Sequence, residues 1–174
     1  MGELNNVLPA LFSELVNGSP DPQVGTFMLN RGDRGLLHSL EQISAAIAST
    51  TATGGATIAA HTDHIRYGLE LLNRWAAGEP SPWKSADWTA SWRKQVVTDA
   101  EWRSLCDALR RETEMWQRHL GTLSNLPDTA AKWVAGSVAH LAYHLGAIRQ
   151  IDRATRGPTA EDERAVSLAS PHEA

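Results

Sequence analysis

Residues 127–153, PDTAAKWVAGSVAHLAYHLGAIRQIDR, indicate the fold class of this chain. Apolar and small side chains recur there at intervals of three and four residues, which predicts one face of an α-helix, with Asp128 placed to cap it. That face carries Trp133, Ser137, His140, His144, Ile148 and Ile151. Since His140 and His144 are four residues apart, both imidazoles should project from the same face, about one helical turn apart.

The remainder of the chain continues the helical pattern, and Thr98 with Glu101 forms a capping-box signature at the start of one segment. The predicted additional helices span about residues 7–17, 33–48, 57–77 and 98–123. No segment alternates apolar and polar residues as a strand would. The sequence therefore predicts an all-α fold of four long helices and a short N-terminal one, with residues 79–97 as a long connection that packs onto the bundle.

A chain of 174 residues is the right length for one compact unit with a single core. Within it we expect an N-terminal helix and linker at residues 1–25, a helical bundle at 26–156 and a loose, polar tail at 157–174.

Composition excludes several classes of function. The net charge of −4 offers no basic surface for neutralising phosphates, so nucleic acid is not an expected partner. No apolar run approaches the roughly 20 residues that cross a bilayer, and the first residues lack a secretory signal, so we expect a cytoplasmic protein without a membrane partner. Cys106 is the only cysteine, so any metal must be bound by histidine or carboxylate.

The His140–His144 pair is the strongest chemical signal in the sequence, because two imidazoles one turn apart can chelate one cation. A third ligand is available from the helix at 57–77, which carries His61 and His64. At about 100° per residue, His61 points to the centre of the apolar face and His64 to its edge, so periodicity slightly favours His61. Three histidines would leave coordination positions for water or substrate, as catalytic sites do.

Residues 57–67 (TIAAHTDHIRY) and 140–151 (HLAYHLGAIRQI) together resemble the DinB-like superfamily. The resemblance covers about residues 30–153 and implies a four-helix bundle in up-down-down-up order, with a crossover at the position of residues 79–97. In the family pattern the first metal ligand is followed directly by an aliphatic residue. This matches His64-Ile65 rather than His61-Thr62, so the resemblance implies His64, His140 and His144 as ligands and keeps His61 as a supporting residue or as the alternate third ligand.

The resemblance also implies what such a site would do. The family includes nickel- or zinc-binding transferases that use low-molecular-weight thiols such as bacillithiol or mycothiol, and stress-induced proteins, and its members often form homodimers. We therefore expect either a metal-dependent thiol transferase or hydrolase acting on a small molecule, or a non-catalytic bundle that the metal stabilises and that serves as a ligand-binding or stress-response module.

Other polar residues near the histidines allow two interpretations. The hydroxyls of Tyr67 and Tyr143 could reach the metal site, although a surface position is commoner for a tyrosine in a bundle. Asp63, Arg66 and Arg149 are expected on solvated faces, the arginines in surface ion pairs. Cys106 is expected to be a core residue. For the connection tryptophans, a covering role is favoured over walling a substrate pocket; they are Trp83, Trp88 and Trp92.

Overall fold

The computed structural model describes residues 4–19, 26–52 and 54–159, so the tail predicted at 157–174 lies outside the described residues from 160 onward. Over these residues the structure is helical and contains no strand, which confirms the all-α prediction. The α-helices are α1 (Leu4–Asn17), α2 (Gly35–Glu41), α3 (Ala45–Ala48), α4 (Ile58–Ala76), α5 (Asp99–Leu120) and α6 (Asp128–Ile151). The 3₁₀ helices are η1 (Pro82–Ser85), η2 (Ala90–Trp92) and η3 (Arg153–Thr155).

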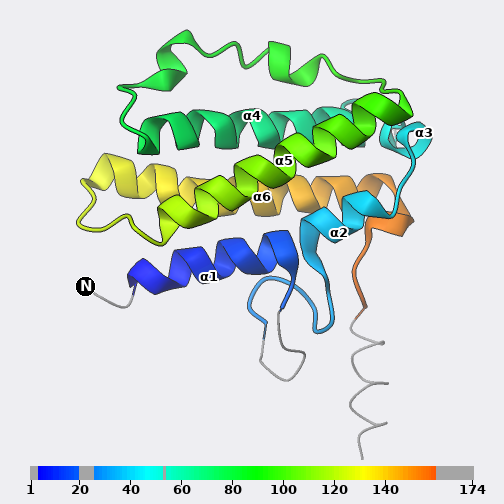
Figure 1. Cartoon of the computed structure of the whole chain (residues 1–174). Helices are drawn as coiled ribbons and strands as arrows, with labels where there is room; N and C mark the ends of the chain where they lie inside the picture. The colour runs from blue at the N-terminus through cyan, green and yellow to red at the C-terminus, as the bar shows by residue number, and fades with distance from the viewer. Residues whose placement is uncertain (1–3, 20–25, 53, 160–174) are drawn as a thin grey trace, which may run out of the picture.

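The long helices lie side by side (Figure 1). Helix α4 packs against α5 and α6, and α1 packs against α6, α2 and α5. The connection at residues 77–98, which carries η1 and η2, runs the length of α4, so α4 and α5 point in the same direction (Figure 1). Helix α6 returns in the opposite direction, beside α1.

The prediction of one continuous helix over residues 33–48 is wrong, because α2 ends at Glu41 and a separate helix, α3, begins at Ala45. Ser44 has an extended backbone, and its side chain accepts a hydrogen bond from the Ile47 amide, so it caps a new helix. At the other end, Gly35 begins α2 at a φ of +76°, where a Cβ would lie 2.6 Å from the Val16 carbonyl oxygen. This close approach of α1 to α2 requires glycine.

The starts of the two longest helices follow different rules. Thr98 and Glu101 form both hydrogen bonds of the predicted capping box at α5. The predicted cap at α6 is wrong: Pro127 occupies the capping position without a side-chain bond, and Asp128 lies in the first turn. A carboxylate there still favours the helix, because it faces the positive end of the helix dipole.

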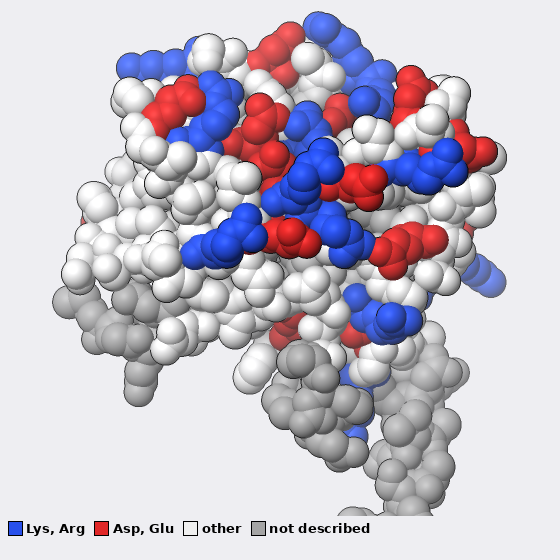
Figure 2. Space-filling view, in the orientation of Figure 1, with Lys and Arg blue, Asp and Glu red and all other residues white. Residues whose placement is uncertain are grey.

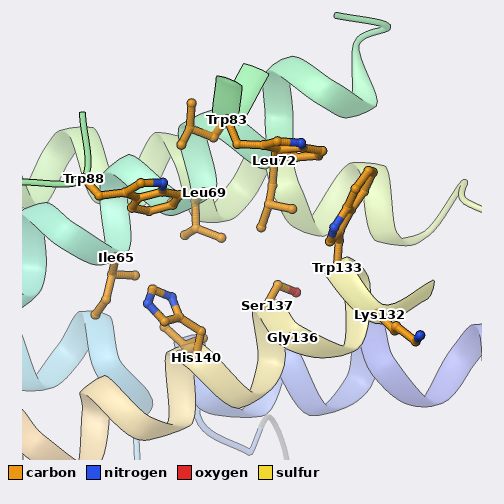
Figure 3. A pocket seen from close by; sticks show the side chains of 13 residues that line it. Ile65, Leu69, Leu72, Trp83, Trp88, Lys132, Trp133, Gly136, Ser137 and His140 are labelled. Atoms are coloured by element: carbon orange, nitrogen blue, oxygen red, sulfur yellow. The ribbon is translucent and has the colours of Figure 1, made fainter. Parts of the chain in front are cut away.

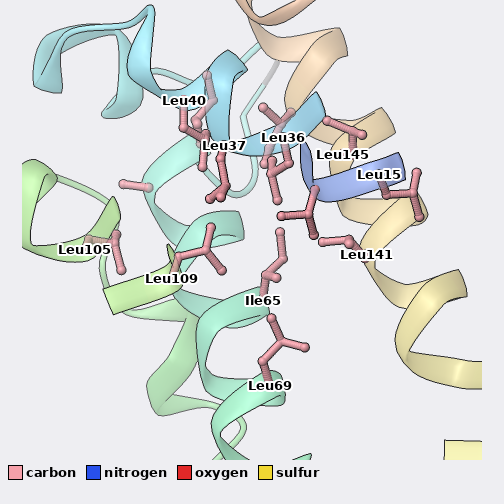
Figure 4. Close-up of a cluster of buried hydrophobic side chains, with 14 of the residues drawn as sticks. Leu15, Leu36, Leu37, Leu40, Ile65, Leu69, Leu105, Leu109, Leu141 and Leu145 are labelled. Carbon is pink, nitrogen blue, oxygen red and sulfur yellow. The ribbon is translucent and has the colours of Figure 1, made fainter. Parts of the chain in front are cut away.

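Helix α1 contributes to the same hydrophobic core as the later helices. Phe12, Leu15 and Val16 are fully buried in a cluster that also contains Leu109 and Leu141 (Figure 4). The predicted division at residues 25 and 156 stays a prediction, but the core is continuous across residue 25 within the described residues.

Asp33 and Arg149 form an ion pair that the fold largely removes from solvent. Asp33 is 3% exposed and forms two 2.8 Å contacts with the Arg149 guanidinium, joining the start of α2 to α6. The surface interpretation of Arg149 is therefore wrong, because its partner is a carboxylate that the fold buries.

On the face drawn in Figure 2, basic and acidic side chains are interleaved rather than gathered into one patch of a single sign. Among the described residues, no helix combines the length and apolarity needed to span a membrane.

Candidate metal centre

Two packed helices supply the four histidines. Thr57 caps α4 by accepting a hydrogen bond from the Ala60 amide, so His61 and His64 lie in the first two turns of that helix. His140 and His144 lie in the second half of α6, and α4 packs directly on α6. The two histidine pairs therefore meet across one helix–helix contact.

Three imidazoles converge through their Nε2 atoms. The Nε2 atoms of His64 and His140 are 3.1 Å apart, and those of His140 and His144 are 3.0 Å apart. One ligand atom from each of these three residues lies within 4.8 Å of the others. Tetrahedral coordination at about 2.0–2.1 Å would separate ligand nitrogens by about 3.3 Å, which is close to the two Nε2–Nε2 distances at His140, so the three residues could hold one divalent ion.

Ser91 determines which nitrogen of His64 carries the proton. The Ser91 hydroxyl donates to the Trp88 carbonyl oxygen at 2.7 Å, and its oxygen lies 2.8 Å from His64 Nδ1. A hydroxyl has one hydrogen, so Ser91 must accept from Nδ1–H. The lone pair of His64 is then on Nε2, which faces the other two histidines, as metal ligation requires.

His61 lies beside this cluster rather than in it. Its Nδ1 is 2.9 Å from Nδ1 of His144, on the side of that ring away from the converging Nε2 atoms. This contact orients the His144 ring. The structure thus groups His64 with His140 and His144, and places His61 as their neighbour, whereas periodicity alone slightly favoured His61.

Burial keeps the cluster neutral. Burial and, to a smaller extent, the neighbouring imidazoles together lower the pKa of His64 to about 4 and that of His144 to about 3. Burial also lowers the pKa of His61 and of His140. All four shifts favour the uncharged imidazole, which is the form that binds metal.

The crossover covers the histidines with aromatic rings. Trp92 stacks on His64 at a centroid distance of 4.1 Å and an interplanar angle of 23°, and Trp88 lies 5.7 Å from the same ring. Sequence reasoning missed Ser91, since its role depends on the path of an aperiodic connection, which places η2 against α4.

The two tyrosines lie at the edge of the site. The Tyr67 hydroxyl accepts a hydrogen bond from the Asp87 amide at 3.0 Å, so it anchors the crossover. Tyr143 is 70% exposed, and its ring contacts the His144 ring edge-on at a centroid distance of 4.9 Å. Tyr143 therefore touches the histidine cluster, whereas the hydroxyl of Tyr67 is used to hold the crossover.

A cavity of about 360 Å³ adjoins the cluster at His140 (Figure 3). Its walls are mainly apolar side chains of α4, α6 and the crossover. They include Ile65, Leu69, Leu72, Trp83, Trp88 and Trp133. Trp83 and Trp88 thus wall a pocket, the less favoured of their two predicted roles.

Asp63 differs from its predicted position, whereas Cys106 on α5 matches the core position predicted for it. Asp63, expected to be solvated, is 8% exposed because Arg66, three residues later, pairs with it at 2.8 Å. Cys106 packs against the core, and burial raises the pKa of its thiol to about 12, so it is not a nucleophile at neutral pH.

Comparison of the chain with family models, with curated proteins and with solved structures gives no match.

Proposed function

We propose that this chain is a DinB-like protein that binds one divalent metal ion, nickel or zinc, through His64, His140 and His144. The observation that carries the proposal is the convergence of three neutral imidazoles on one point, with Ser91 directing the lone pair of His64 towards that point. Three neutral histidines in a buried cluster would be poorly satisfied by one another, because an Nε2 lone pair facing a second lone pair forms no hydrogen bond.

The chain directions support the family assignment. Helices α1, α4, α5 and α6 run in the order up, down, down, up, and the crossover joins α4 to α5 (Figure 1). In this proposal α1 takes the place of the bundle helix predicted at 33–48, so the bundle begins before residue 26, and residues 33–48 form an insertion between its first and second helices.

The favoured activity is that of a metal-dependent enzyme, a thiol transferase or a hydrolase acting on a small molecule. A divalent ion held by three histidines retains open positions and supplies Lewis acidity, which favours the deprotonated form of a water or thiol. His64, His140 and His144 would hold the ion. Ser91 and His61 orient two of these rings, and Trp92 covers His64 from solvent.

A second candidate is a non-catalytic bundle that the metal stabilises, used as a ligand-binding or stress-response module. The observation in its favour is that the cluster joins two helices, so metal binding would add directly to the free energy of folding.

We further propose that the protein is cytoplasmic and forms a homodimer. Light scattering on the purified protein would measure its molar mass and so test the dimer.

The two candidates differ in turnover and in thermal stability. Purified protein, stripped by chelator and reloaded with nickel or zinc, would be assayed for conjugation of bacillithiol or mycothiol to a panel of electrophiles, and for ester and amide hydrolysis. The enzyme proposal expects turnover that needs metal, is lost in His144→Ala and is kept in His119→Ala, a histidine outside the cluster. A lack of turnover, together with a large rise in melting temperature on loading, would instead favour the structural role.

A further inference from the structure

The cavity beside His140 has the features of a site for one class of small molecule. It lies between α4 and α6 beneath the crossover, and the indoles of Trp83, Trp88 and Trp133 form its walls (Figure 3). We call it the tryptophan cavity. We propose that it binds the aromatic part of an uncharged small molecule that carries a hydrogen-bond acceptor at its His140 end. This inference rests on the proposed function in taking that molecule to be the substrate of the metal site.

The walls favour flat apolar groups. Trp83 and Trp133 lie at a centroid distance of 4.1 Å, and Trp133 also packs edge-on against Trp75, so two indoles are held in place by their neighbours. Trp88 is 43% exposed, which leaves apolar surface uncovered beside His64. Aromatic groups stack on such surfaces and remove them from water.

The charges around the tryptophan cavity disfavour an ionic ligand. No aspartate or glutamate is among its lining residues, and the one charged side chain is Lys132, which is directed away from the cavity in Figure 3. Tryptophan faces attract cations, but here a cation would lack a carboxylate partner. A carboxylate in the cavity would be desolvated without a cation beside it.

His140 supplies the polar contact at one end. Its Nε2 lies in the histidine cluster, so when that atom carries the lone pair, Nδ1 carries the hydrogen. This Nδ1 has no hydrogen-bond partner among the described residues, and it would lie 3.8 Å from a Cβ at Gly68, which also lines the cavity. The hydroxyl of Ser137 is already used, since it accepts from Trp116 and donates to Val134. A ligand should therefore present an acceptor to His140.

The volume sets the size of the ligand. A space of about 360 Å³ lies near the lower end of the roughly 300–1,000 Å³ range of ligand pockets. This is the volume of about twelve water molecules in liquid water. One or two fused aromatic rings with a short substituent would occupy it.

Helix α6 offers a matched pair of variants. Gly136 lines the tryptophan cavity and Gly146 does not, while both glycines are exposed and a Cβ at either would meet nothing within 4 Å. Leucine at either position raises helix propensity. Gly136→Leu should therefore fill the cavity without unfolding the helix, and Gly146→Leu is its control.

The test is calorimetric titration of metal-free, full-length protein with three naphthalene probes: 2-acetylnaphthalene, 2-naphthoate and protonated 2-(aminomethyl)naphthalene. We expect the ketone to bind at least tenfold more tightly than either ion, Gly136→Leu to weaken it at least tenfold, and Gly146→Leu to leave it unchanged. Nuclear Overhauser contacts from the probe ring to the Trp83 and Trp133 indoles give a check in the unmutated protein.

Equal binding of the ketone to Gly136→Leu, tighter binding of an ion, or contacts to other residues would overturn the inference. Because the metal is absent from this titration, the result does not depend on turnover. If the probe binds in the cavity but the metal-loaded protein has no activity, only the enzyme proposal is rejected. If the metal-loaded protein is active but no probe binds, only the proposed ligand of the cavity is rejected.

Discussion

Replacing Ser91 by alanine removes the group that fixes the proton on His64 Nδ1. His64 is 8% exposed, so Nδ1–H would be left buried without an acceptor, at a cost of about 1–3 kcal/mol. Metal-free protein can avoid this cost by moving the proton to Nε2, but metal binding would then have to expel it. The penalty should therefore fall on metal affinity, with a loss of about 10- to 100-fold, or about 1.4–2.8 kcal/mol.

The assay is competition of zinc or nickel between the protein and a colorimetric chelator at pH 7.5. The control is Ser85→Ala, since Ser85 lies in η1 of the same crossover and also donates to the carbonyl three residues earlier, at 3.3 Å from Pro82. Unchanged affinity in Ser91→Ala, or the same loss in Ser85→Ala, would refute the role given to Ser91.

Three further predictions concern stability. Metal-free protein should lose stability as the pH falls from about 6.5, by about 1.4 kcal/mol per pH unit for each histidine protonated only when unfolded, because the folded pKa is about 4 for His64 and about 3 for His144. Arg149→Ala should cost about 3–5 kcal/mol in urea unfolding, because it leaves the Asp33 carboxylate buried without its partner. Leu109→Ala should cost about 2–5 kcal/mol by the same measurement, since that side chain is fully buried.

Each of the three stability predictions has a control variant of the same protein. The double variant His64→Ala, His144→Ala should flatten the pH dependence between 6.5 and 5, and an unchanged slope would contradict its assignment to these rings. Arg74→Ala breaks an exposed ion pair with Glu79 and should change the free energy of unfolding far less than Arg149→Ala does. Val96→Ala, at a side chain 77% exposed, should stay within about 0.5 kcal/mol. Costs equal to these controls would contradict the buried roles of Arg149 and Leu109.

The regular helices were predictable because periodicity and capping act locally. The pattern at 57–77 and the Thr98–Glu101 box predicted α4 and the start of α5 within a residue or two. The break at Gln42–Ser44 was not predicted, because apolar spacing continues through residues 36–47 and outweighs a single serine cap.

The site was predictable only as far as one helix determines it. His140 and His144 share a face because they are four residues apart on α6. The choice between His61 and His64 depends on where α4 contacts α6, which spacing within α4 does not determine. Ser91 and the tryptophan cavity depend on the path of the crossover, where no periodic pattern exists. Asp63 was expected in solvent because it points away from its neighbour His64 on the helix, but Arg66 pairs with it and so lowers the cost of burying its carboxylate.

The most direct test of the three-histidine site is the metal content of single alanine variants, measured by mass spectrometry after reconstitution with zinc or nickel and desalting. We expect about one ion per chain in the unmutated protein and in His61→Ala, and almost none in His64→Ala, His140→Ala or His144→Ala. Unmutated protein without metal would contradict the site itself. Full occupancy in His64→Ala together with loss in His61→Ala would replace His64 by His61 as the third ligand.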